Sequence, residues 1–127
     1  MKLCIENGNR HSELRNLAGL DAAFVQFPDA GFCFSFANAY DYDTTMIEAT
    51  LMLRKYADRL CLIRLGAMSC SGYPEMIHLT VFNSYRKVVK LIPRDVPVVL
   101  EYPVGLETMG KYVNIAEKLF RCESAPE

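Results

Sequence analysis

The chain has 127 residues, of which 51% are hydrophobic, and its 14 basic and 15 acidic residues leave a formal net charge of -1. This size and composition predict one folded domain with a packed core. Without a basic excess the chain is not expected to bind nucleic acid, and no apolar run reaches the roughly 20 residues that cross a membrane. The first residues do not form a signal peptide, so a cytoplasmic protein is expected.

Short apolar runs alternate four times with segments of helical periodicity, which is typical of consecutive parallel strand-helix units. The first strand is expected at 2–6, followed by a helix that Ser12 could cap and that Gly19 interrupts. The second strand, at 31–36, is apolar enough to be buried on both faces, as parallel strands are.

The clearest helix follows the second strand, where Thr45 and Glu48 have capping-box spacing. The third strand is expected at 59–65 and is followed by a long loop, rich in serine and glycine, at 66–79. The apolar stripe that predicts this helix consists of Met46, Ala49, Leu53, Tyr56, Ala57 and Leu60.

The rest of the chain repeats the pattern. A helical stripe over 82–92 stops at Pro93, a strand follows at 96–101, and a last helix begins near Thr108. We expect residues 1–122 to form an α/β domain of four βα units, half of a (β/α)8 barrel, and residues 123–127 to form a polar tail.

Three charged residues are expected at the carboxyl ends of the strands, which meet at one edge of a parallel sheet. Glu6 and Glu101 end the first and last strands, and Arg64 interrupts the apolar third strand. Two carboxylates in one site need a cation or a raised pKa, and either state suits proton transfer, so these three are the candidate catalytic residues. Alternatively, the glutamates cap helices or face solvent, and Arg64 extends outward to water.

The cysteines predict no zinc site and no disulfide framework, because no pair has Cys-x-x-Cys spacing. Cys4, Cys33 and Cys61 lie in apolar runs and are interpreted as reduced core residues, while Cys70 lies in the long loop.

Four short motifs, in order, resemble the carboxyl-terminal half of the xylose isomerase-like TIM-barrel superfamily, which includes sugar-phosphate isomerases and epimerases and type IV apurinic endonucleases. Residues 3–7 (LCIEN) are similar to that family's fifth-strand Glu-Asn pair, and residues 33–39 (CFSFANA) match its sixth strand. Arg64 stands where the seventh strand carries a metal-binding histidine, and Glu101 matches the glutamate that ends the eighth. His78 resembles the histidine of the loop after the seventh strand. The resemblance makes Asn7, Asn38 and His78 candidates for substrate binding.

The departures from the family predict a degenerate site. The family's metal ligands are Glu, Asp, His and Glu, whereas this chain offers Glu6, Ser35, Arg64 and Glu101. Arginine has no lone pair for a metal, so we expect no cofactor and expect Arg64 to bridge the two glutamates in the metal's place. The alternative is a divalent metal held by Glu6, Glu101 and His78.

The resemblance therefore predicts a sugar-phosphate isomerase/epimerase-like half-barrel that has lost the full family activity, with a small sugar-like molecule as its possible ligand. Whether it is an enzyme stays open: the alternatives are a non-catalytic binding or interaction module and a flavodoxin-like open sheet. Because four parallel strands leave two free sheet edges, a homo-oligomer is expected.

Overall fold

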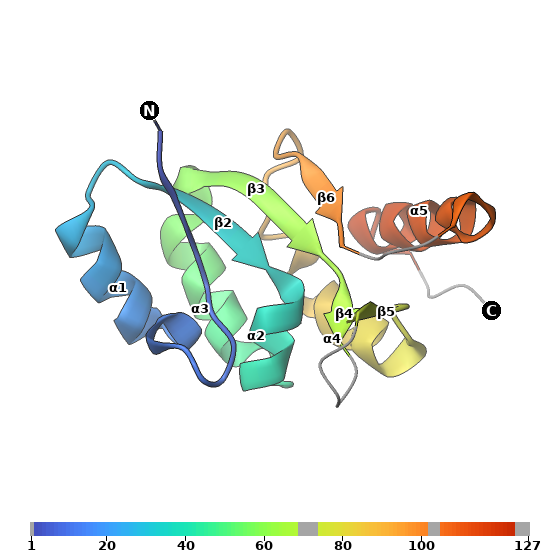
Figure 1. Cartoon of the computed structure of the whole chain (residues 1–127), viewed down its shortest axis with the longest axis horizontal. Coiled ribbons are helices and arrows are strands. Elements are labelled where there is room, and N and C mark those ends of the chain that lie inside the picture. The colour runs from blue at the N-terminus through green and yellow to red at the C-terminus, as the bar shows by residue number, and fades with distance from the viewer. Residues whose placement is uncertain (1, 69–73, 102–104, 124–127) are drawn as a thin grey trace.

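The computed structural model describes residues 2–68, 74–101 and 105–123, and it is an α/β fold built on a parallel sheet (Figure 1). Strands β1 (Cys4–Glu6), β2 (Gly31–Ser35), β3 (Leu60–Leu65) and β6 (Val98–Leu100) lie side by side in chain order, and every neighbouring pair is parallel. The predicted order of strands and helices is confirmed to this extent.

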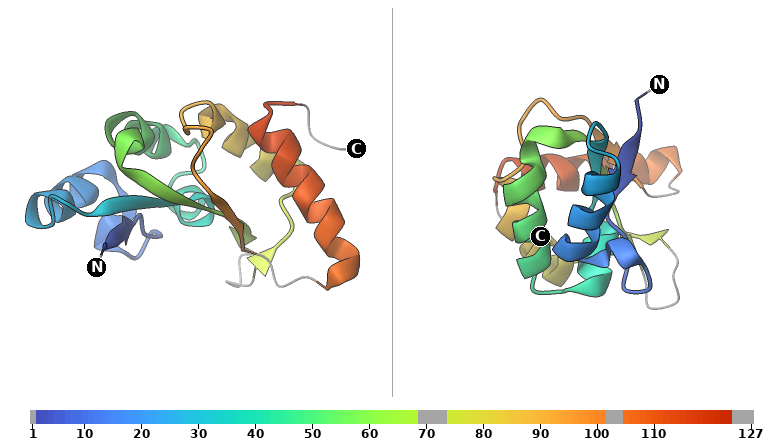
Figure 2. Two further views of the ribbon diagram at one scale, coloured as in Figure 1. Left: turned by 90° about the horizontal axis from the view of Figure 1, so that it is seen from above. Right: turned by 90° about the vertical axis from the view of Figure 1, so that its left-hand side faces the viewer.

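Five α-helices occur in the described residues, and they form a layer against the sheet. Figure 2 shows α1, α3 and α4 on one side of the sheet, with α5 continuing the layer beside β6. The helices are α1 (Leu17–Gln26), α2 (Phe36–Tyr42), α3 (Ile47–Tyr56), α4 (Leu79–Val89) and α5 (Leu106–Phe120). Short 3-10 turns span Glu13–Arg15 and Ala57–Arg59, and a small hairpin joins β4 (Ala67–Met68) to β5 (Pro74–Glu75).

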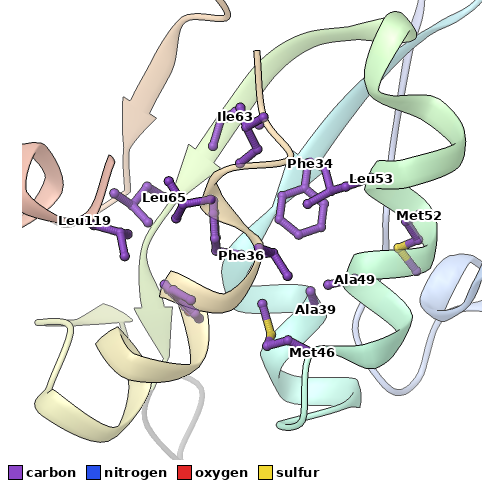
Figure 3. Packing of buried hydrophobic residues seen from close by; sticks show 14 of the residues in the cluster. Phe34, Phe36, Ala39, Met46, Ala49, Met52, Leu53, Ile63, Leu65 and Leu119 are labelled. Atoms are coloured by element: carbon purple, nitrogen blue, oxygen red, sulfur yellow. The ribbon is translucent and has the colours of Figure 1, made fainter. Parts of the chain in front are cut away.

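The core lies between the helices and one face of the sheet, which we call the helix face and which carries Phe32, Phe34, Ile63 and Leu65. All four side chains have 0% exposure. Alternate residues of a strand point to opposite faces, so the apolar residues at these positions bury one side of the sheet against α3 and α4 (Figure 3). Phe34 also packs edge-to-face on Phe32, with ring centroids 6.1 Å apart.

The opposite side of the sheet, which we call the open face, carries Cys4, Glu6, Cys33, Arg64 and Val99. The strand register pairs Glu6 with Cys33 and Arg64 with Val99, which places these side chains on one side. All five residues of β2 are nevertheless buried, as predicted for this strand, because side chains from β1 and β3 reach over it.

The predicted interruption at Gly19 is wrong, because Gly19 lies inside α1. A side chain there would place its Cβ 1.8 Å from the carbonyl oxygen of Glu13, so this position needs glycine for a close tertiary approach. Ser12 caps the preceding 3-10 turn by accepting a hydrogen bond from the N–H of Leu14, while Asn16 caps α1 itself.

The predicted capping box of Thr45 and Glu48 is also wrong. The carboxylate of Asp43 accepts hydrogen bonds from the N–H groups of Thr45 and Glu48, each at 3.0 Å. The side chain of Glu48 instead accepts a hydrogen bond from the N–H of Leu17. Asp43 therefore closes the tight connection between α2 and α3, and α2 was not predicted.

Within the described residues, no helix is long and apolar enough to cross a membrane. Of the predicted polar tail only Glu123 falls in the described part, and Cys70 lies outside it.

Candidate functional site

The site centres on Arg64, whose guanidinium lies between the two glutamates at the carboxyl ends of the strands. Its Nη1 donates hydrogen bonds to both carboxylate oxygens of Glu6 at 2.8 Å, and its Nη2 donates to Oε2 of Glu101. The predicted bridge is confirmed as geometry, while the catalytic role of the three residues stays a prediction. The bridge connects three strands, because Glu6 ends β1, Arg64 belongs to β3 and Glu101 follows β6.

Backbone contacts position Glu101 beside Arg64. The N–H of Glu101 donates a hydrogen bond to the carbonyl of Leu65 at 2.8 Å, which extends the pairing of β3 with β6 by one residue. Gly66 permits this approach, since a Cβ at Gly66 would lie 2.9 Å from the carbonyl oxygen of Glu101. The strand ends are thus held closely enough for one guanidinium to reach both carboxylates.

The three charges are partly open to solvent. The exposed fractions of the side chains are 40% for Arg64, 29% for Glu6 and 28% for Glu101. Partial burial by itself would lower the pKa of Arg64, but attraction to Glu6 and Glu101 outweighs this effect and raises the pKa. The guanidinium is therefore a permanent cation, which can orient a ligand or polarise a carbonyl oxygen but cannot exchange a proton.

Cys33 lies beside these charges on the open face and is buried. Burial, followed by the nearby charge of Glu6, raises the pKa of its thiol to about 12. Since only a thiolate is a strong nucleophile, Cys33 is a neutral packing residue at physiological pH.

Two of the predicted substrate-binding residues connect the strand ends. Asn7 is fully buried, and its amide donates to the carbonyl of Ser35 at 3.0 Å and accepts from the N–H of Ser35 at 2.7 Å. Asn38 donates to the carbonyl of Asn7 at 2.9 Å, and Ser35 accepts a hydrogen bond from the N–H of Asn38. These contacts support the end of β1, from which Glu6 projects. A contact of Asn7 or Asn38 with a substrate stays a prediction.

His78, the third of these residues, is exposed at the N-cap position of α4, and its carbonyl accepts a hydrogen bond from the N–H of Phe82. The described residues contain no group of three or more His, Cys, Asp or Glu side chains that could hold a metal ion. Arg64 forms ion pairs with Glu6 and with Glu101, and a divalent metal held by Glu6, Glu101 and His78 stays a prediction.

A pair of thiols on the open face was missed by the sequence interpretation. Cys4 is exposed rather than in the core, Cys61 is half-buried, and their Sγ atoms lie 2.6 Å apart. The position of Cys4 in the sequence could have predicted this. Cys4 precedes Glu6 by two residues, so both must lie on the same face of β1.

Comparisons with protein-family models, with curated proteins and with solved structures give no significant match.

Proposed function

We propose that this chain is a (βα)4 half-barrel of the sugar-phosphate isomerase/epimerase type that binds a small sugar-like ligand at its strand ends without catalysing the family reaction. The observation that carries the proposal is the placement of Arg64 between Glu6 and Glu101. It is the arrangement expected if a guanidinium replaces the positive charge of a lost metal.

The sheet topology favours half of a barrel over a flavodoxin-like domain. A doubly wound open sheet reverses its strand order at a switch point and carries helices on both faces. The four strands described here run in chain order, without a reversal, and Figure 2 shows the helices as a layer on one side. Both features are those of a segment cut from a (β/α)8 barrel.

The charges favour binding over proton transfer. A general base needs a carboxylate oxygen that can reach the substrate's proton, but both oxygens of Glu6 already accept hydrogen bonds from the guanidinium of Arg64. The same groups suit the recognition of a sugar, because carboxylates accept hydrogen bonds from hydroxyl groups and a guanidinium donates to hydroxyl or phosphate oxygens. Their partial exposure leaves room for such contacts.

Ligand-observed NMR with a panel of aldose and ketose phosphates tests the proposal, with and without added Mn²⁺ or Mg²⁺. We expect binding of at least one sugar phosphate and no exchange of its C2 proton with solvent. Arg64→Met should weaken binding about tenfold or more, because a charged hydrogen-bond donor is lost. The control is Arg54→Met, which removes an exposed arginine from α3 and should bind like the parent.

Two results would contradict this assignment. Proton exchange that is lost in Glu6→Gln would show that the glutamate pair is catalytic. Absence of binding across the whole panel would favour the interaction module without a small ligand.

The free sheet edges support the proposal that the half-barrel assembles with a second copy. In the described residues β1 and β6 each pair with a single neighbour. Beside β6, helix α5 exposes Leu106, Met109 and Val113, and Leu106 is 93% exposed. Their spacing of three and four residues places them on one stripe of the helix, where another helix can pack.

Light scattering at micromolar concentration tests the assembly, and we expect twice the mass of one chain or more. Val113→Lys should shift the equilibrium toward the monomer, because a charge would interrupt the stripe. Ile47→Lys, at an exposed position of α3, is the matched control. A stable monomer in the parent protein would exclude the assembly.

A further inference from the structure

Cys4 and Cys61 meet on the open face although their strands are not neighbours. Strand β2 lies between β1 and β3, and the Sγ atoms approach to 2.6 Å above it. Gly31 of β2 makes the approach possible, since a Cβ at this position would lie 3.2 Å from Sγ of Cys4 and 3.1 Å from Sγ of Cys61.

Besides Gly31, the register of β2 with β3 is needed to bring the two thiols together. Phe32 pairs with Leu60 but Cys33 pairs with Leu62, so Cys61 is an extra residue in β3. Such a bulge redirects a side chain locally. Here it brings the thiol of Cys61 to the thiol of Cys4, whose strand position is opposite Gly31.

We propose that Cys4 and Cys61 form a redox-active dithiol, which reacts with small-molecule disulfides of the glutathione type and closes a disulfide between β1 and β3. The thiols already lie within about 0.6 Å of the roughly 2.0 Å length of a disulfide bond. This site is independent of the sugar-binding proposal.

The greater exposure of Cys4 than of Cys61 indicates which thiol reacts first with the oxidant and which then closes the disulfide. Cys4 is exposed on an edge strand, so its thiolate attacks the disulfide oxidant, forms a mixed disulfide and releases one small thiolate. Cys61 then loses its proton to water, attacks Sγ of Cys4 and displaces the second small thiol. The protein thus gives up two electrons and two protons, and one small disulfide becomes two thiols.

The surroundings of Cys61 suit the second step better than the first. Its thiol is half-buried and donates to the carbonyl of Phe32 at 3.4 Å. Burial, and then the hydrogen bond with Cys4, raises the pKa of Cys61 to about 11. Free oxidant therefore meets little thiolate at Cys61, whereas a mixed disulfide on Cys4 places the target sulfur next to it.

Peptide mapping tests the proposal on the full chain. The protein is equilibrated with glutathione disulfide, free thiols are blocked, and trypsin cleaves without reduction. We expect a linked pair of the peptides 3–10 and 60–64, about 2 Da lighter than their sum. Addition of dithiothreitol should return both peptides unlinked.

Three variants separate this site from general thiol oxidation. Cys61→Ser should stop at the mixed disulfide on Cys4, and Gly31→Ala should slow the linkage about tenfold, because a methyl group would press against both sulfurs. Cys122→Ser, which removes an exposed cysteine after α5, should leave the linkage unchanged.

The proposal is overturned if the parent protein gives no link between 3–10 and 60–64, or if Cys4 links as readily to Cys122 or to another chain. If Gly31→Ala does not fold, the contrast between the parent and Cys61→Ser decides the question. Circular dichroism of each variant establishes that it is folded.

Discussion

The two faces of the sheet are built from alternate residues of the same strands, yet they differ in chemistry. On the helix face, Phe34 and Ile63 pair across β2 and β3 and are fully buried. On the open face, the next residues along, Ser35 and Arg64, pair in the same register, and Arg64 is 40% exposed. Consecutive residues of one strand therefore face an apolar core on one side of the sheet and a polar surface on the other.

In this fold, one face of the sheet contributes most to stability and the other face carries the reactive groups. The helix face excludes water and contributes burial of aromatic and aliphatic area. The open face contributes less burial, but it holds the charges of Glu6, Arg64 and Glu101 and the Cys4–Cys61 pair. The variants below test this division from the largest expected effect to the smallest.

The largest effect is expected on the helix face. Phe34→Ala should lower the free energy of unfolding by about 3–5 kcal/mol, because it leaves a cavity between Phe32, Phe36 and α3. Val99→Ala, at a 46% exposed position of the open face, is the control and should cost about 0.5 kcal/mol. Urea denaturation measures both, and equal losses would contradict the division of the faces.

A disulfide between Cys4 and Cys61 should raise the free energy of unfolding by about 2–4 kcal/mol, since it closes a long loop in the unfolded chain. The cysteines are 57 positions apart, and their strands are already in contact with β2 in the folded state. Urea denaturation of oxidised and reduced protein gives the difference. The control is Cys4→Ser under the same oxidation, for which no change is expected.

The strand pattern and the bridge could be predicted because both depend on alternation and on strand ends. Glu6, Arg64 and Glu101 follow or end apolar runs, and parallel strands bring such positions to one edge. That Arg64 replaces a metal is a prediction from the resemblance alone, while the guanidinium contact itself follows from charge.

Other features could not be predicted because they depend on tertiary geometry. Gly19 looked like an interruption, but its requirement comes from the carbonyl of Glu13 in another segment. The meeting of Cys4 with Cys61 requires a register shift in β3 and the missing side chain of Gly31. Neither condition has a signature within a single strand.

Helix α2 was missed for a different reason. It begins directly after β2, where Ser35 both ends the strand and caps the helix by accepting from the N–H of Asn38. With seven residues it is too short for an apolar stripe to repeat.

Arg64→Met should cost about 1–3 kcal/mol at pH 7, because Glu6 and Glu101 would then face each other without a cation. Partial exposure keeps the loss below that of a fully buried pair. The loss should shrink at about 1 M salt, since screening weakens the repulsion between the two carboxylates. Urea denaturation at low and at high salt measures this trend.

Two further variants separate the effect of the charge of Arg64 from that of its packing. Glu101→Gln added to Arg64→Met should recover part of the stability by removing one of the facing charges. Arg54→Met, at an exposed position of α3, should change stability by less than about 0.5 kcal/mol at either salt concentration. A loss that is the same at low and at high salt would mean that packing, not charge, explains the effect of Arg64.

The smallest effect is expected at Asp43, which positions the helix that covers the core. Burial by itself would raise the pKa of Asp43, but hydrogen bonds from the Thr45 hydroxyl and from the N–H groups of Glu48, Thr45 and Ile47 lower it below 3.8. Asp43→Ala should cost about 1 kcal/mol, as for other caps of helix starts.

The sign of the pH dependence follows from the lowered pKa. An ionised Asp43 stabilises the fold above about pH 4, and this contribution is lost as pH falls through its folded-state pKa. The difference between the parent and Asp43→Ala should therefore be constant from pH 5 to pH 7 and narrow in stronger acid, as measured by thermal unfolding. Thr44→Ala, at an exposed neighbouring position, controls for the loop. If the difference stays constant through acid, the charge of Asp43 is not the source of the stabilisation.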